Sequence, residues 1–329
     1  MTSWAKANSS STESSLPPPR GLICPLVSPL AEDGRIDHRS LKRLLAHVGR
    51  WADALLFADL RWGEAVELGM ERRQELVSAA LTLTDGRLPL MVCITGASLD
   101  QTRVLEDEFL RAAERIAYRG PLYAVDYPLV YHGNRDLPRL LAENDGGRRA
   151  PLIIGNDPKR VRGLKGPAHH CNIRTAVLKK IASVPRVCAM IFRGSLKRSL
   201  DYQAAVRMRR KFLFYDGDES VFLNKPGMGG VVSGGSNLLP EDWAHVIRSS
   251  LGRCDTDRQV RSHQRDVWAS GELLRALHRL YRPDPAARLK RTLARSGLIA
   301  SEATASGVSA MPEEWGAELD RFLQRYDLT

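Results

Sequence analysis

The 329-residue sequence has no run of about 18 apolar residues, so we expect no membrane-spanning helix. Residues 1–20 are rich in Ser and Pro and lack the apolar stretch of a secretory signal peptide, which favours a disordered N-terminal tail. No GxGxxG motif follows the first apolar segment, so the sequence gives no sign of a dinucleotide site, and we expect no cofactor.

Cysteine is scarce and scattered. Five residues with no CxxC spacing are not typical of a disulfide framework or a cysteine-based zinc site, and we expect a reducing, cytoplasmic location: Cys24, Cys93, Cys171, Cys188 and Cys254. The pair His169–His170 has no third ligand spaced nearby, so we expect no metal site there.

Acidic residues are outnumbered, and the formal net charge is +11. Such a surplus suits either nucleic acid or small anionic ligands. The densest basic clusters, 159–162 and 207–211, have no aromatic residues beside them on which bases could stack. We therefore expect a solvated basic surface, and nucleic-acid binding is not favoured.

Short apolar runs alternate with amphipathic segments from Gly21 onward. The expected strands are Leu22–Val27, Ala54–Ala58, Leu88–Thr95, Leu122–Val125, Leu152–Ile154, Val187–Ile191, Phe212–Tyr215 and Gly230–Ser233. The expected helices are Ser40–Val48, Met70–Leu83, Asp100–Tyr118, Leu137–Ala142, Thr175–Ile181, Leu196–Arg210, Glu241–Ser250, Asp257–Tyr281, Ala286–Arg295 and Glu313–Tyr326.

Eight strand–helix units with continuously apolar strands favour an α/β fold, a (β/α)8 TIM barrel, over an open doubly wound sheet. The predicted organisation is a disordered tail (1–20), the barrel (21–240), and the last barrel helix with a C-terminal helical extension (241–329).

The order of several motifs resembles the dihydrodipicolinate synthase/N-acetylneuraminate lyase family of class I aldolases. CPLVSPL at 24–30 with DGRID at 33–37 is similar to the family's "TPF…DG.ID" start. Gly63–Glu64 with Leu68 and the ERR at 71–73 is similar to the end of "GTTGE…L…ER". GNDP at 155–158 stands where the family has "YNxP", and GGVVS at 229–233 with Asn237 and Pro240 is similar to its eighth-strand motif.

The resemblance implies a pocket for a 2-oxo acid, and this chain departs from it at the reactive positions. The family's Schiff-base lysine aligns with Ile191, and the tyrosine of "YNxP" aligns with Gly155. The two threonines that bind the substrate carboxylate correspond to Arg61 and Trp62. Because an imine forms from an unprotonated amine, which Ile191 lacks, the family's imine mechanism cannot operate at this position.

Other residues could form a binding or catalytic site that does not need an imine. Arg61, Arg160 and Arg193 stand at predicted strand ends and could form a cationic pocket for a small carboxylate or phosphate. Tyr131 and His132 follow the fourth strand and are candidates for an acid/base pair.

Two lysines are candidates for a relocated Schiff base: Lys165, in the enlarged loop 156–174, and Lys225, in the loop before the eighth strand.

Three functions stay open at this point. The chain is a lyase- or aldolase-type enzyme on a small anionic, 2-oxo-acid-like ligand that works without an imine, a catalytically inactive relative with a binding or structural role, or an aldolase with a relocated lysine. A mouth filled by Trp62, Ile191 and Phe192 would favour the inactive relative, and one lined by the three arginines would favour the enzyme. The resemblance also implies a homo-oligomer, a dimer or a tetramer.

Overall fold

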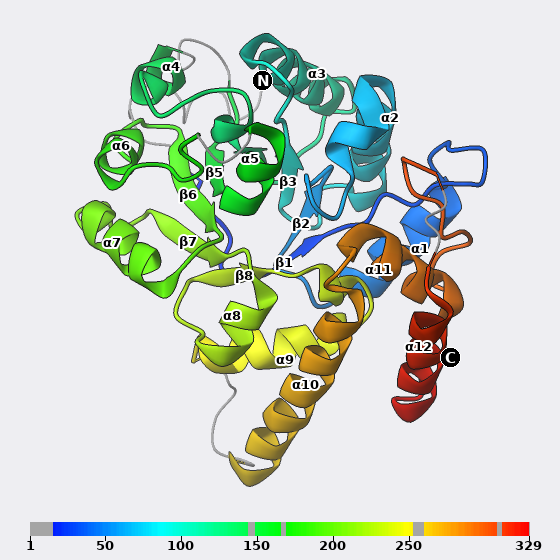
Figure 1. Cartoon of the computed structure of the whole chain (residues 1–329). Coiled ribbons are helices and arrows are strands. Elements are labelled where there is room, and N and C mark those ends of the chain that lie inside the picture. The colour runs from blue at the N-terminus through cyan, green and yellow to red at the C-terminus, as the bar shows by residue number, and fades with distance from the viewer. Residues whose placement is uncertain (1–15, 144–148, 166–168, 253–259, 308–310, 329) are drawn as a thin grey trace.

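Eight parallel strands close into one barrel in the computed structural model, which describes residues 16–143, 149–165, 169–252, 260–307 and 311–328. The strands follow one another around the barrel in chain order (Figure 1): β1 (Gly21–Pro25), β2 (Ala54–Phe57), β3 (Leu90–Cys93), β4 (Leu122–Asp126), β5 (Leu152–Asn156), β6 (Val187–Phe192), β7 (Leu213–Asp216) and β8 (Gly230–Val232). The predicted (β/α)8 barrel with C-terminal helices is confirmed.

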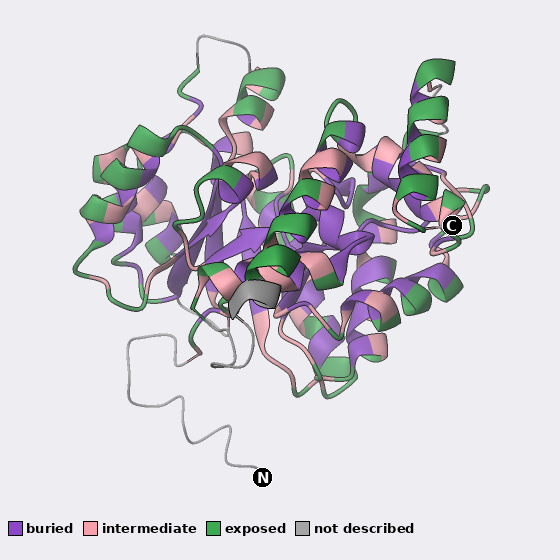
Figure 2. Cartoon of the chain, turned by 90° about the horizontal axis from the view of Figure 1, so that it is seen from below, coloured by how far each residue is buried: buried purple, intermediate pink, exposed green. Residues whose placement is uncertain are grey.

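Helices surround the strands and turn their exposed faces outward (Figure 2). They are α1 (His38–Val48), α2 (Ala65–Thr84), α3 (Leu99–Arg115), α4 (Leu137–Glu143), α5 (Pro158–Lys165), α6 (Thr175–Ile181), α7 (Leu196–Val206), α8 (Glu219–Asn224) and α9 (Pro240–Ser250). Two short 3-10 helices, Pro128–Val130 and Gly234–Asn237, lie among the strand-end loops.

The helix α1 shows how local sequence sets these elements. The Asp37 side chain accepts from the backbone N–H groups of Arg39 and Ser40, which caps the first turn. Leu41, Leu44 and Val48 then form the buried stripe that the 3.6-residue period predicts.

Alternation along each strand separates two apolar layers. Ile191 and Ala189 on β6 face the barrel interior, while Met190 and Phe192 face the surrounding helices. Because the interior layer is filled by side chains, the barrel is a packed core, and functional groups are confined to its ends.

The C-terminal extension consists of α10 (Val260–Tyr281), α11 (Pro285–Arg295) and α12 (Glu313–Arg325). The indole N–H of Trp315 on α12 donates to the carbonyl of Leu280, 2.8 Å away, and so fastens α12 to α10. On α11, the buried ammonium of Lys290 forms an ion pair with Glu64 and also donates to the carbonyl of Ala303. The extension is therefore fixed to the strand-end face beside α2.

Part of the segment predicted as a disordered tail has a defined place. The Tyr123 hydroxyl donates to the carbonyl of Pro17 at 2.7 Å, and the Tyr215 hydroxyl donates to that of Pro19 at 2.6 Å. Leu16 packs against the interior layer. Residues 16–20 thus cover the amino-terminal end of the barrel, and the rest of the predicted tail lies outside the described residues.

Several predicted boundaries differ from those in the structure. The segment α2 consists of two helices joined at Gly69, whose φ of +72° and ψ of 174° are not helical; the second agrees with the predicted start at Met70, and the first, residues 65–68, was not predicted. Val104 is 44% exposed and so lies outside the buried face of α3. The segment 156–174 contains α5, and the helix that starts at Leu196 ends at Val206, four residues earlier than predicted.

Candidate functional site at the strand ends

The side chain of Ile191 points into the barrel at the carboxyl end of β6 and is fully buried. Gly155 on β5 and Tyr215 on β7 are its neighbours in register. The branched hydrocarbon side chain of Ile191 therefore occupies the interior position at which the resemblance implies a Schiff-base lysine. It supplies no donor, acceptor or proton.

The ring of Tyr127, at the end of β4, fills the space beside Gly155. A Cβ at position 155 would come within 2.2 Å of that ring, so no larger residue fits there. The Tyr127 hydroxyl donates to Oδ1 of the fully buried Asp59 at 3.3 Å. Burial, followed by the charge of Asp59, raises the pKa of Tyr127 and keeps the phenol protonated.

Arg193 extends from the end of β6 on the same side as Ile191, since both side chains approach Gly217. Its Nη1 donates to Asp157 Oδ2 at 2.7 Å, and its Nε donates to the carbonyl of Gly217 at 2.7 Å. Burial alone would raise the pKa of Asp157, but the adjacent Arg193 guanidinium and the backbone N–H of Arg160 together lower that pKa. Arg193 Nη2 is buried and meets no hydrogen-bond partner in the described part of the chain.

The other two arginines lie nearer the surface, and both are half-buried. The Arg61 guanidinium lies 5.1 Å from the centre of the Trp62 ring. Arg160 on α5 pairs with Glu67 on α2 at 3.5 Å, so this contact joins helices that follow strands on different sides of the barrel end (Figure 1). Carboxylates accompany two of the three arginines of the predicted cationic pocket: Glu67 lies beside Arg160, and Asp157 lies beside Arg193.

The apolar plug predicted from Trp62, Ile191 and Phe192 does not form as one unit. Trp62 is buried, but its ring packs on Gly234 and edge-on against Tyr281 of α10, with ring centres 5.4 Å apart. Phe192 faces outward and packs edge-on against Tyr202 of α7. Of the three, only Ile191 belongs to the interior layer, since alternation sends Phe192 to the opposite face.

Tyr131 forms its hydrogen bond with the Asp126 carboxylate and not with His132. Its hydroxyl donates to Asp126 Oδ2 at 2.7 Å, and Thr95 donates to Oδ1 of the same carboxylate at 2.9 Å. Burial raises the pKa of Asp126 to about 6 despite these two donors. The His132 ring is turned to the carbonyl of Gly133, 2.7 Å from Nδ1, so the structure does not bring Tyr131 and His132 together as an acid/base pair.

Neither candidate lysine lies in the barrel interior. Lys165 Nζ donates to the carbonyl of His132 at 3.1 Å, on the rim of the strand-end face. Lys225 is exposed at the end of α8, directly before β8, and so lies at the amino-terminal end of the strands. Within the described ranges no three metal-ligating side chains are grouped, and His170 contacts Arg174 instead.

Three members of this cluster were not among the predicted site residues: Asp59, Tyr127 and Asp157. Asp59 and Tyr127 each follow a predicted strand, as strand-end residues of a barrel do, and that position was the available signal. Asp157 was noted only as part of a motif. Its pairing with Arg193 joins residues 36 positions apart and depends on the register of β5 and β6.

The fold and the cluster define the class: a (β/α)8-barrel protein with its polar groups gathered at the carboxyl ends of the strands. The 4-hydroxy-tetrahydrodipicolinate synthase of Persephonella marina is 28% identical over 247 residues, which cover 73% of this chain and 78% of that protein. No protein-family profile matches the sequence.

Solved structures agree in fold. Dihydrodipicolinate synthase from Bacteroides thetaiotaomicron superposes with a TM-score of 0.76 at 20% identity, covering 94% of this chain and 99% of that one. The chloride-inhibited enzyme from Acinetobacter baumannii, complexed with pyruvate, gives 0.75 at 17% identity, covering 95% and 100%. In sequence and in fold the chain is thus similar to dihydrodipicolinate synthases. No described helix is both long and apolar enough to span a membrane.

Proposed function

We propose that this chain is a divergent member of the dihydrodipicolinate synthase family, which binds a small carboxylate of the 2-oxo acid class at the strand ends and acts on it as a lyase without forming an imine. The observation that carries the proposal is Arg193 Nη2, a buried donor beside Ile191 with no partner in the described residues. A guanidinium grips a carboxylate through paired N–H groups, so an anionic ligand would satisfy this donor.

The cluster has the groups that such a reaction needs. When a base removes the 4-hydroxyl proton of a 4-hydroxy-2-oxo acid, the C3–C4 bond breaks, an aldehyde leaves, and the electron pair stays on the 2-oxo acid as an enolate that is then protonated at C3. The Arg193 guanidinium can donate to the enolate oxygen. Asp59, within 3.3 Å of the Tyr127 hydroxyl, is the carboxylate able to accept a proton. Charge stabilisation by Arg193 replaces the electron sink of an imine in this scheme.

A catalytically inactive relative is the second candidate. One observation favours it: Ile191, Tyr127 and Trp62 are all at most 2% exposed, and the polar groups around them largely pair with one another. The relocated-lysine alternative lacks such support, because Lys165 lies at the rim and Lys225 at the opposite end.

Titration with pyruvate, followed by the NMR signal of the Ile191 methyl groups, tests the proposal. We expect a saturable shift that weakens about tenfold or more in Arg193→Met, since a charge-assisted hydrogen bond is lost. Arg160→Met, which alters an arginine paired with Glu67, is the matched control and should bind nearly as the parent does.

Turnover separates the two candidates. Pyruvate release from 4-hydroxy-2-oxo acids supports the lyase, whereas binding without release supports the inactive relative. If saturating pyruvate leaves the Ile191 signal unmoved, the proposed function is wrong.

The resemblance also suggests a cytoplasmic homo-oligomer, a dimer or a tetramer. Leu196 and Leu200 are exposed one turn apart on α7 and offer an apolar contact for a second copy. Light scattering on the purified chain measures the subunit number directly, and a monomer at all concentrations would refute association.

A further inference from the structure

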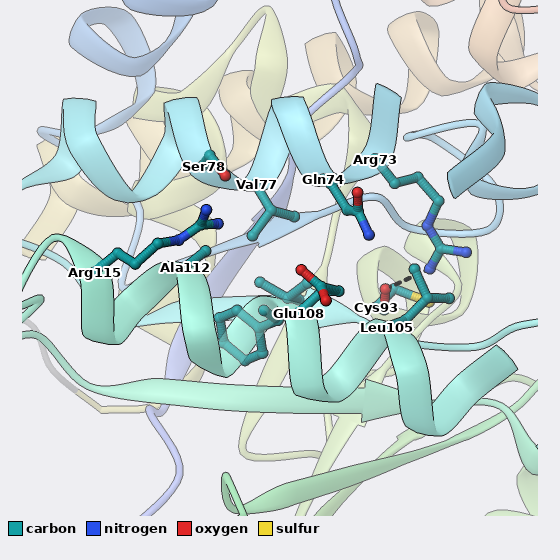
Figure 3. Close-up of a pocket in the computed structure, with 11 residues that line it drawn as sticks. Arg73, Gln74, Val77, Ser78, Cys93, Leu105, Glu108, Ala112 and Arg115 are labelled. Carbon is teal, nitrogen blue, oxygen red and sulfur yellow. Dashed lines mark hydrogen bonds between the residues drawn. The ribbon is translucent and has the colours of Figure 1, made fainter. Parts of the chain in front are cut away.

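A separate cavity of about 160 Å³ lies outside the barrel, between α2 and α3 (Figure 3). Both helices and β3 contribute to its lining: Arg73, Gln74, Val77, Ser78, Val92, Cys93, Leu105, Glu108, Phe109, Ala112 and Arg115. None of the strand-end groups Ile191, Tyr127 and Arg193 lines it, so its chemistry is independent of the proposed function.

Arg73 places a buried positive charge at one end of this cavity. Arg73 is only 5% exposed, and its guanidinium donates to the carbonyls of Thr95 at 3.0 Å and Cys93 at 2.7 Å. A guanidinium has five N–H donors, so these two bonds use less than half of them. Across the described ranges Arg73 forms no ion pair with a carboxylate.

A buried cation without a counter-charge is costly, and burial accordingly lowers the pKa of Arg73. An anion in the cavity would supply the missing charge. Glu108 also lines the cavity, but its carboxylate forms an ion pair with Arg111 on the same helix. At the far end stands a second cation, Arg115 (Figure 3).

The rest of the lining is largely apolar. Val77 projects from α2, Val92 from β3, and Leu105, Phe109 and Ala112 from α3. This surface would exclude a fully hydrated ion but would accept a short hydrocarbon chain.

We infer that the cavity between α2 and α3 binds a short-chain aliphatic carboxylate. The carboxylate lies on the Arg73 guanidinium, and the hydrocarbon chain lies along Val77 and Phe109. The Gln74 amide, which points into the cavity, adds a neutral donor near the carboxylate (Figure 3).

Butyrate titration at constant ionic strength tests this site in the full chain. Methyl NMR signals of Val77, Val92 and Leu105 report on the cavity, and those of Ile191 report on the strand ends. We expect a saturable shift at the three cavity residues, and none with n-butylammonium, which has the same chain length and the opposite charge.

Two variants change the cavity in different ways. Ala112→Leu fills the cavity and leaves Arg73 in place, and Arg73→Gln removes the charge. Each should weaken butyrate binding about tenfold or more. Arg103→Gln, on α3 outside the cavity lining, should bind as the parent does.

The inference is overturned if butyrate shifts only Ile191, if n-butylammonium shifts the cavity residues equally, or if Ala112→Leu binds as the parent does. Should Arg73→Gln fail to fold, Ala112→Leu still decides. A positive result here with no pyruvate response at Ile191 would reject the proposed function and keep this site.

Discussion

Arg193 and Asp157 form the buried ion pair on which the strand-end cluster depends. Their side chains are 6% and 12% exposed, so solvent screens the pair only weakly. Removing one partner of such a pair leaves a desolvated charge and costs about 3–5 kcal/mol.

We therefore predict that Arg193→Met lowers the free energy of unfolding by about 3–5 kcal/mol, measured by urea denaturation. The double variant with Asp157→Asn should lose less than the sum of the two single variants, because neither charge is then left alone. Strictly additive losses would show that the two side chains do not interact.

Asp216, at the end of β7, gives a second prediction through pH. Burial, and then the charge of Asp218, raises the pKa of the Asp216 carboxyl from 3.8 to about 7. The folded chain thus holds a proton that the unfolded chain releases near pH 4. The stabilisation is fully present below pH 4 and is lost as the pH rises through about 7.

Between those values this group should lower the free energy of unfolding by up to about 1.4 kcal/mol per pH unit. Asp126, with a pKa near 6, contributes in the lower part of the same window. Urea denaturation from pH 6 to 7 should show the slope in the parent and in Asp126→Asn, and a flatter profile in Asp216→Asn. An unchanged slope in Asp216→Asn would contradict the assignment.

At the residue scale the sequence identified Ile191 and Arg193 at the end of β6 but not the residues that they contact. Both side chains approach Gly217, as expected for residues two positions apart along a strand. The partners Tyr127, Asp59 and Asp157 come from other strands, and their distances depend on strand register. No local pattern in a single sequence carries that information.

At the scale of elements, residues 16–20 cover the amino-terminal end of the barrel. Two tyrosine hydroxyls from β4 and β7 donate to carbonyls of this short segment. A Ser- and Pro-rich composition indicated disorder, but prolines lack the N–H while keeping the carbonyl, so they can still accept these bonds.

We predict that a chain starting at residue 20 is less stable than one starting at residue 16 by about 2 kcal/mol, since two hydrogen bonds worth about 1 kcal/mol each are lost. Thermal and urea denaturation of the two truncated chains measure the difference. Equal stability would mean that the segment contributes nothing to the fold.

Asn237 provides a second link between elements. Its side chain accepts from the Val27 N–H at 3.1 Å and donates to the carbonyls of Pro25 and Gly234. It thereby fastens the end of β1 to the loop after β8, more than 200 positions away in the chain.

We predict that Asn237→Ala lowers the free energy of unfolding by about 2–4 kcal/mol, because buried backbone groups lose their partners. The exposed Asn224→Ala, on α8, is a comparison in which only one bond, to the carbonyl of Ser220, is lost. A loss no larger in Asn237→Ala than in Asn224→Ala would contradict this role.

At the scale of the whole molecule, the sequence predicted the barrel because eight alternations leave few topologies. Parallel strands need crossover helices, and this number of units in about 220 residues closes most simply into a ring. The kink at Gly69 and the end of α7 were not predicted, because tertiary packing overrides local propensity at helix ends. The α2/α3 cavity was not predicted, because it lies between two helices and depends on how they pack.

The barrel is complete, and the interior position at the carboxyl end of β6 carries the hydrocarbon side chain of Ile191. The most direct measurement of this central claim is incubation of the intact chain with pyruvate and borohydride, followed by mass spectrometry. We predict an unmodified mass and no modified lysine peptide, since Ile191 cannot form an imine and neither Lys165 nor Lys225 reaches the barrel interior. A pyruvate-dependent covalent adduct on any lysine would contradict the loss of imine chemistry.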